Sequence, residues 1–172
     1  MHRRIRFAPT CLAAVAALLL AALPVAAAPR GPSTQEERDK AIALARLLET
    51  TPWTDEATAA RQWLVTFLGE APDITVKQCR SLLGTPAERA AVPPTIADQI
   101  MFSGAAYIFE HPGSGAGSTP TLLAGLEGAL ASYAAWRTHG GLDAVPLLDN
   151  LLQVRKDGGL EAHVRGHARG CN

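Results

Sequence analysis

Apolar residues recur along this chain at the three- and four-residue spacing of amphipathic helices. The clearest stripe, which would share one helix face, consists of Ala60, Trp63, Leu64, Phe67 and Leu68. Clean alternation of apolar and polar residues, which marks a half-buried strand, does not occur, and aromatic residues make up only 5% of the chain. The pattern therefore predicts an all-α protein.

Start and stop signals divide this pattern into six or seven helices, which we expect to form an orthogonal bundle. Helix starts are marked by capping side chains or by proline in the first turn, and helix ends by glycine. Capping boxes occur at Ser33–Glu36 and Thr85–Glu88. The predicted helices begin near Ser33, Thr54, Asp73, Thr95, Thr119, Asp143 and Leu160, and a separate segment of only one or two turns begins at Thr85.

The predicted helix over 119–138 has two apolar stripes, one of large and one of small residues. A helix that is apolar on two sides is expected at the centre of a bundle, in contact with several neighbours. Gly104, in the helix before it, costs about 1 kcal/mol relative to alanine, so we expect the two helices to cross closely there. The large stripe is Leu123, Leu126, Leu130 and Tyr133, and the small stripe is Ala124, Gly128, Ala131 and Ala135.

Residues 1–28 have the form of a cleaved signal peptide. Three arginines come first, then an uncharged apolar run, then Pro24 and small residues that suit a signal peptidase. We expect cleavage after Ala27, because cleavage one residue later would place Pro29 at the scissile bond. The alternative is an uncleaved anchor, which Pro24 and the high alanine content disfavour. The protein is thus predicted to be exported, to the periplasm or the medium, with 29–172 as a single helical domain that has no membrane span.

Removal of this segment changes the charge balance. The whole chain carries 16 Lys+Arg and 16 Asp+Glu, and the segment contains three of the bases and no acid, which leaves 13 bases, 16 acids and a net charge of −3. A mildly acidic domain lacks the positive surface needed to bind nucleic acid or an anionic membrane. We expect no cofactor, and the expected partner is another protein of the envelope.

Removal of the segment also leaves an even pair of cysteines, Cys79 and Cys171. Oxidising compartments favour a disulfide between them over two free or metal-binding thiols. The bridge would close a loop of 171 − 79 = 92 positions, for which the chain-entropy model gives about 4–5 kcal/mol. The third predicted helix would carry Val76, Cys79 and Leu83 on one face and so turn Cys79 inward.

Glu127 is the leading candidate for a ligand-binding or acid–base group. It is the only acidic residue in the long stretch between Glu110 and 143, and it falls midway along the predicted central helix. A carboxylate there must be exposed, paired with a base, or shifted in pKa. In the last case it would work in a cleft with Glu110 or His111, although His111 also simply complements the end of its helix. The candidate bases for a structural pair are Arg61, Arg80 and Arg155.

His163 and His167 are the only candidates for metal binding. With Cys171 they are spaced i, i+4, i+8, so one helix face could present all three. A metal site needs at least a third ligand and an outer shell, and a disulfide would remove the thiol. We therefore expect no metal.

Two loops hold the remaining candidates. Trp53 follows the helix-breaking Pro52, so we expect partial exposure, which makes it a candidate interface anchor. The glycine-rich loop 113–118 lacks the lysine and the preceding strand of a phosphate-binding loop and is expected to be a linker.

No catalytic motif is present, and no serine has the context of a nucleophile. In size, helix content and expected compartment the chain resembles small exported all-α bacterial proteins with one disulfide, a class that includes periplasmic immunity proteins. The resemblance covers no particular residues and carries no site across. We expect a non-catalytic protein-binding module such as an envelope inhibitor or immunity-type protein. The alternative is a small envelope enzyme or ligand-binding domain that uses Glu127 with Glu110 or His111.

Overall fold

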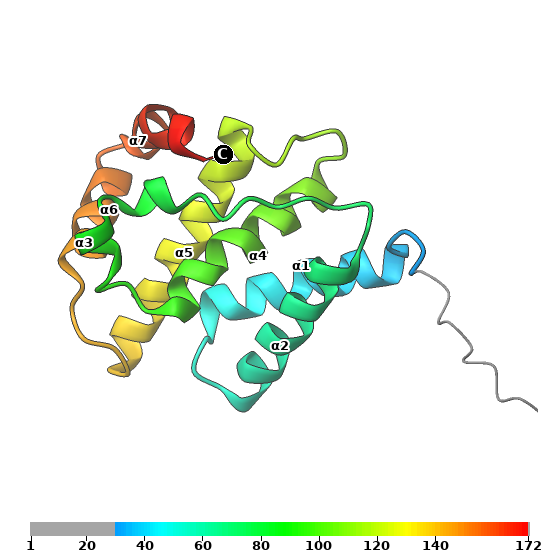
Figure 1. Ribbon diagram of the computed structural model, residues 1–172. Helices are drawn as coiled ribbons and strands as arrows, with labels where there is room; N and C mark the ends of the chain where they lie inside the picture. The colour runs from blue at the N-terminus through cyan, green and yellow to red at the C-terminus, as the bar shows by residue number, and fades with distance from the viewer. Residues whose placement is uncertain (1–29, 172) are drawn as a thin grey trace, which may run out of the picture.

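The computed structural model describes residues 30–171, which form a bundle of seven α-helices and two short 3-10 helices and contain no strand (Figure 1). The all-α prediction is confirmed, whereas the signal segment 1–28 lies outside the described residues. Within the described range, every helix is too short or too polar to cross a membrane. The elements are α1 (Gln35–Thr50), α2 (Asp55–Glu70), η1 (Arg80–Leu83), α3 (Pro86–Arg89), α4 (Pro94–Glu110), α5 (Thr119–His139), α6 (Pro146–Lys156), α7 (Leu160–His167) and η2 (Ala168–Gly170).

The first capping box lies one residue later than predicted. Thr34, not Ser33, caps α1: its side chain accepts from the Glu37 amide at 3.2 Å, and the Glu37 carboxylate accepts from the Thr34 amide at 2.8 Å. Ser33 instead donates its amide and its hydroxyl to the carboxylate of Asp73, at 2.8 and 2.7 Å. The sequence around 33–37 allows either box, and the long-range contact with Asp73 selects the second one.

The prediction of a helix from Asp73 is wrong. Residues 74–79 form an extended strap that passes over α4 and α5 and ends in η1 (Figure 1). The carboxylate of Asp73 is occupied by Ser33 and cannot cap a helix. Ile74 is buried and Val76 half-buried, while the residues between and after them are exposed, which is the alternation of an extended chain. The β-branched residues in 74–76 favour this conformation.

Two further helices begin at a proline and not at the predicted capping residue. The helix predicted from Thr95 starts at Pro94, and the one predicted from Asp143 starts at Pro146. Proline suits the first turn, because its missing N–H would have no partner there. Tyr133 replaces the side-chain cap of α6: its buried hydroxyl accepts from the Val145 amide at 2.9 Å and donates to the Asp149 carboxylate at 2.7 Å.

The helix α4 separates two clusters of buried apolar side chains. Figure 1 shows α4 in the middle of the molecule, with α1 and α2 on one side and α5 to α7 on the other. On the first side Phe102, Ala105 and Ala106 pack with α1 and α2. On the second side Ile96 and Ile100 pack with α5, α6, α7 and η1. Buried residues therefore occur on more than one face of α4.

The predicted close crossing of α4 and α5 is present, but Gly104 is not its closest point. A Cβ at Gly128 would collide with Ser103 Oγ and lie 2.7 Å from Glu49 Oε1, and a Cβ at Gly125 would lie 2.5 Å from the Ile100 carbonyl oxygen. At Gly104 a Cβ would meet Thr121 at an ordinary 3.7 Å. The buried small residues of α5 are Gly125, Gly128, Ala129 and Ser132, while Ala124, Ala131 and Ala135 are half-buried.

The space at Gly128 is filled by a chain of hydrogen bonds that joins α1 to α4. Gln99, which is 1% exposed, donates its amide to the Ala45 carbonyl at 3.1 Å and to Ser103 Oγ at 2.9 Å. Ser103 Oγ donates to Glu49 Oε1 at 2.7 Å, and this oxygen also accepts from Arg46 at 2.7 Å. Such a network favours one packing arrangement, because any other arrangement would leave a buried polar group without a hydrogen-bond partner and would cost the free energy of removing that group from water.

Alanine substitutions at Gly128 and Gly104 should have different effects on the free energy of unfolding. We expect Gly128→Ala to destabilise the fold by at least about 1–3 kcal/mol, because the new methyl group overpacks the space that Ser103 and Glu49 occupy. Gly104→Ala, the matched control on α4, should be neutral or stabilising by up to about 1 kcal/mol from helix propensity. Denaturant unfolding measures both, and equal effects would contradict the assigned crossing point.

The predicted disulfide is present between Cys79 and Cys171, whose Cα atoms lie 4.6 Å apart. Both residues are buried. Two further contacts hold the C-terminal segment to the strap and η1: Ser81 Oγ donates to the His167 carbonyl at 2.8 Å, and Lys77 Nζ donates to the Cys171 carbonyl at 3.0 Å. The disulfide therefore joins two segments that are already in register.

Loss of the disulfide should cost much of the stability. For a sequence separation of 92, we expect the Cys79→Ala/Cys171→Ala variant to lose about 4–5 kcal/mol of unfolding free energy, because the unfolded chain regains the freedom that the closed loop removes. The measurement is denaturant unfolding of this variant beside the oxidised protein. A loss below about 1 kcal/mol would mean that the noncovalent contacts alone hold the C-terminal segment.

Candidate functional site

Trp53 lies on the surface in a four-residue loop, 51–54, between α1 and α2. The loop begins where the Thr51 amide closes α1 on the Leu47 carbonyl and ends where Thr54 caps α2 by accepting from the Ala57 amide at 3.1 Å. Trp53 is half-buried, as the prediction of partial exposure requires. A short loop with both ends closed by hydrogen bonds presents this side chain in a defined position.

Two aromatic side chains from the last turn of α5 support Trp53. Its indole stacks on the His139 ring with centroids 4.1 Å apart and an angle of 2°, and it meets Trp136 edge to face at 6.2 Å. The left-handed Gly140 ends α5, and Gly141 then lies on the Trp136 ring, where a Cβ would approach two ring carbons to 2.7 Å. We call Trp53, Trp136 and His139 the aromatic surface.

Arg61 on α2 fixes the loop that carries Trp53, because its Nη2 donates to the Pro52 carbonyl at 2.5 Å. Burial lowers the pKa of Arg61, and the charge of Asp98 on α4 opposes this shift. Burial likewise raises the pKa of Asp98, opposed by Arg61, and its Oδ1 accepts from Gln78 of the strap at 3.2 Å. These half-buried charges tie α2, α4 and the strap together behind the aromatic surface.

The three residues predicted to share a ligand site face different neighbours. Glu127 is 43% exposed and its Oε2 lies 3.5 Å from the guanidinium of Arg155, so the structure selects one of its three candidate bases. The Glu110 carboxylate lies 2.8 Å from Arg46 of α1. His111 ends α4, stacks on Tyr107 at 4.1 Å and bonds to the Tyr107 carbonyl at 3.0 Å. The arrangement gives each residue a structural contact.

His163 and His167 stack at 4.1 Å along α7. His163 Nε2 bonds to the Leu82 carbonyl at 3.0 Å, and His167 Nδ1 bonds to the His163 carbonyl at 2.7 Å. Since a carbonyl only accepts, each imidazole donates here. The thiol that could complete a metal site is in the disulfide, and within 30–171 no group of three or more His, Cys, Asp or Glu is placed to hold a metal ion.

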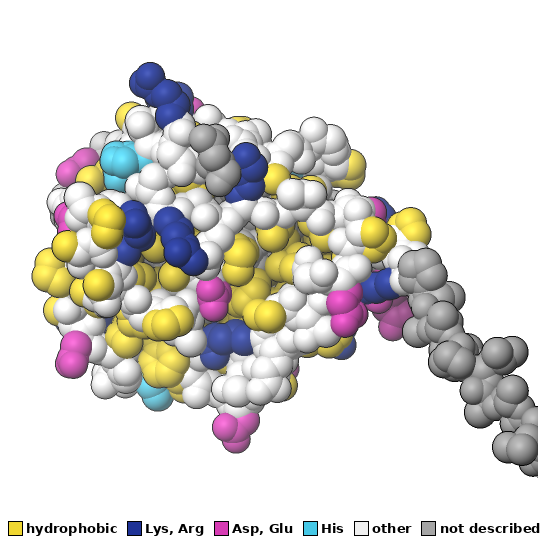
Figure 2. Space-filling model, in the orientation of Figure 1, with side chains coloured by type: hydrophobic (Ala, Val, Ile, Leu, Met, Phe, Trp, Pro, Cys, Tyr) yellow, Lys and Arg dark blue, Asp and Glu magenta, His cyan; other side chains and the backbone are white. Residues whose placement is uncertain are grey.

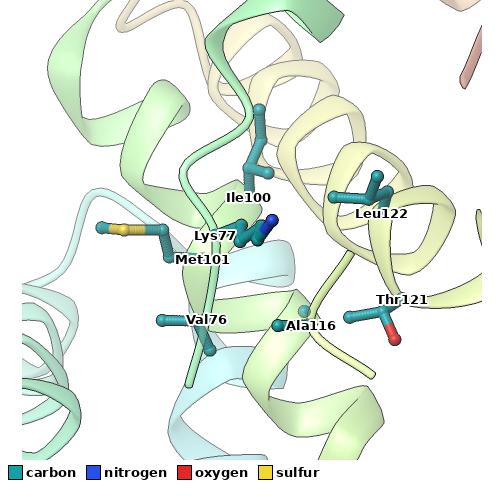
Figure 3. Close-up of a pocket in the computed structure, with 8 residues that line it drawn as sticks. Val76, Lys77, Ile100, Met101, Ala116, Thr121 and Leu122 are labelled. Carbon is teal, nitrogen blue, oxygen red and sulfur yellow. The ribbon is translucent and has the colours of Figure 1, made fainter. Parts of the chain in front are cut away.

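Two hollows of the described surface, a cavity and a recess, are lined by other residues than the predicted site residues. A cavity of about 10 Å³ lies under the strap and has room for about one water molecule. Figure 3 shows Ile100, Thr121 and Leu122 around it, with Met101 pointing away. Ala116 places the glycine-rich loop at this cavity. A shallow recess of about 340 Å³ is lined by Glu88, Ala91, Val145, Pro146, Leu147 and Asn150.

The sequence did not single out Asp98 or the buried pair Gln99 and Ser103. Asp98 is one of many acidic residues in the sequence, and only its contact with the strap and its proximity to Arg61 distinguish it. Gln99 and Ser103 sit within an apolar helix, and a polar residue on such a face is the one signal that could have indicated the buried network.

Comparison with family models, with curated proteins and with solved structures found no match to this chain.

Asp98→Asn should change the pH dependence of stability. Because burial raises the pKa of Asp98 in the folded protein above its unfolded value, ionisation disfavours the folded state as the pH rises through that interval. We therefore expect the variant to be more stable than the wild type near neutral pH, by less than about 1 kcal/mol for this partly solvated group, and equal to it in acid.

Asp143→Asn is the matched control, because Asp143 is exposed. Urea unfolding from acid to neutral pH measures both variants against the wild type. A gain at Asp98 that does not depend on pH, or an equal gain at both positions, would contradict the assignment of the shift to burial.

Proposed function

We propose that the protein is exported and that its helical bundle is a non-catalytic binding module for another protein of the cell envelope, with Trp53 as the anchor of the interface. The observation that carries the proposal is the support of Trp53 by His139, Trp136 and the loop that Arg61 holds. Rigid tryptophans are enriched among the residues that dominate binding energy, since they bury a large area at low cost in conformational entropy.

Export is supported by two independent features. Residues 1–28 have the order of a basic start, an apolar run and small residues that signal peptidases recognise. The bundle contains a disulfide of long sequence separation, and such bonds persist in oxidising compartments.

The other candidate residues are held in structural contacts, which favours a binding function over catalysis. Glu127, Glu110 and His111 are each engaged by a different structural partner, which favours structural roles for them. A supported aromatic surface suits contact with a protein.

Site-specific photo-crosslinking tests this function. A benzoylphenylalanine placed at Trp53 should give a discrete adduct with one envelope protein in the cells that produce this chain. The same probe at Thr66, an exposed position on α2 whose hydroxyl bonds only within its helix, should give none. Comparable adducts at both positions would indicate random encounter and would overturn the proposed interface.

Alanine substitution then separates binding from stability. Trp53→Ala should weaken the complex with that protein by about 30-fold or more, the effect of losing a dominant interface residue. Trp63→Ala is the matched control: Trp63 is a half-buried tryptophan on α2 that stacks on Phe67 at 4.8 Å, so it loses a similar aromatic contact away from the proposed interface. Titration of both variants by calorimetry measures the difference. Equal affinity of the two variants would contradict the role of Trp53.

A further inference from the structure

Four positive side chains gather at the end of the molecule that holds the disulfide. We call Lys77, Arg80, Arg89 and Arg169 the cationic corner. Lys77 bonds to the Cys171 carbonyl, the Arg89 guanidinium lies 3.4 Å from the Arg80 carbonyl, and the segment with Arg169 packs its Gly170 against Ser81. Figure 2 shows Lys and Arg side chains over η1, α3 and the C-terminal segment.

The four corner cations form no ion pair within the described residues. Arg30, Arg38, Arg46, Arg155 and Arg165 each pair with a carboxylate, whereas no corner cation lies within ion-pair distance of a described acid, a property that Lys40, Arg61, Arg137 and Lys156 share. The one acid within 76–90 is Glu88, and its carboxylate is held by the backbone and side chain of Thr85 at 2.8 and 2.7 Å. The corner cations thus lack a direct ion pair, and Asp98 reaches Arg80 only through the side chain of Gln78.

The fold joins the two segments that create this charge. Residues 76–90 and 160–171 together contain five Lys and Arg and two acids, of which Arg165 and Glu161 pair with each other, and the disulfide bonds one segment to the other. Residues 36–73, which form α1 and α2, contain eight acids and four bases. Like charges repel, so two positively charged segments do not come together through electrostatics alone. The disulfide holds them side by side and so concentrates positive potential at this place.

We infer that the cationic corner is a second binding surface and that it takes an acidic segment of a partner protein. Three of its four cations are arginines, whose planar guanidinium groups bind carboxylates through paired hydrogen bonds. Because the described bundle has a net negative charge with its acids concentrated on α1 and α2, an extended anionic membrane would be attracted at the corner and repelled elsewhere. A narrow acidic segment contacts the corner alone.

This surface is separate from the aromatic surface. Lys77 lies against Gly117, just before the first residue of α5, whereas His139 is its last residue. A helix of 21 residues spans about 30 Å, well beyond the Debye length of about 8 Å at physiological salt. The inference therefore does not depend on the role proposed for Trp53.

Binding of fluorescein-labelled deca-glutamate to the oxidised protein, followed by anisotropy, tests the inference. We expect saturable binding that weakens from low to physiological salt, and none of labelled deca-glutamine. Arg80→Gln/Arg169→Gln removes two exposed corner charges and leaves the contacts of Arg89 and Lys77 in place, and it should weaken binding about tenfold or more. Lys40→Gln/Lys156→Gln removes the same net charge elsewhere and should stay within about twofold of the wild type.

Three results would overturn the inference: no saturable binding of deca-glutamate, an equal loss in both double variants, or binding to phosphatidylglycerol vesicles that exceeds binding to the peptide and depends on Arg80 and Arg169. The last result would assign the corner to a membrane surface. Trp53→Ala should bind deca-glutamate like the wild type, so failure of this inference and failure of the proposed aromatic interface give different patterns.

Discussion

The close approach of α4 and α5 at Gly128 is the constraint on which the rest of the structure depends. Only a residue without a side chain leaves room there for Ser103 and Glu49, and these two groups connect α4 to the last turn of α1. The loop that carries Trp53 starts directly after that turn. The hydrogen bonds among Gln99, Ser103 and Glu49 therefore help to place Trp53 against the last turn of α5, although they lie more than one helix turn away from it. Gly128 thus links three features: the close packing of α4 and α5, the hydrogen bonds of the buried polar groups, and the position of Trp53 on the surface.

The opposite end of α5 is organised by a different kind of constraint. There the backbone is extended, and an extended segment buries less apolar surface than a helix packed along its length. The strap compensates through fixed ends: Asp73 holds Ser33 and Arg38 at its start, and Cys79 is bonded to Cys171 at its end. Bonds from Ser33 lower the pKa of Asp73, so this anchor stays ionised in more acidic solution than an ordinary aspartate does. Covalent and ionic contacts hold the strap in place, whereas apolar packing holds the helices around α4.

Much of the architecture follows from local patterns, and the failures have a common cause. The apolar periodicity of α1, α2, α5 and α6 and the cysteine pair were sufficient to predict an all-α fold with one disulfide. The helix predicted from Asp73 failed because a distant serine occupies the capping carboxylate. The helix starts predicted at Thr95 and Asp143 failed because proline in the first turn and the hydroxyl of Tyr133 replaced a local cap. Glu127 was correctly expected to need a base, but only the fold shows that this base is Arg155. Apart from the two prolines, which are local signals, each missing element was a contact between residues far apart in the sequence, which no local pattern encodes.

The two surfaces also differ in what holds them, and this difference makes them separable. The aromatic surface depends on α1, α2 and the last turn of α5, which are joined by the polar chain at Gly128 and by Arg61. The cationic corner depends on the strap, η1 and the C-terminal segment, which are joined by the disulfide. Trp136 and the disulfide pack against the same apolar cluster, but the aromatic surface and the cationic corner lie at opposite ends of α5. Sites this far apart without shared partners contribute almost additively to stability. A bundle of this size can therefore present one apolar and one charged surface, each of which can change without loss of the other.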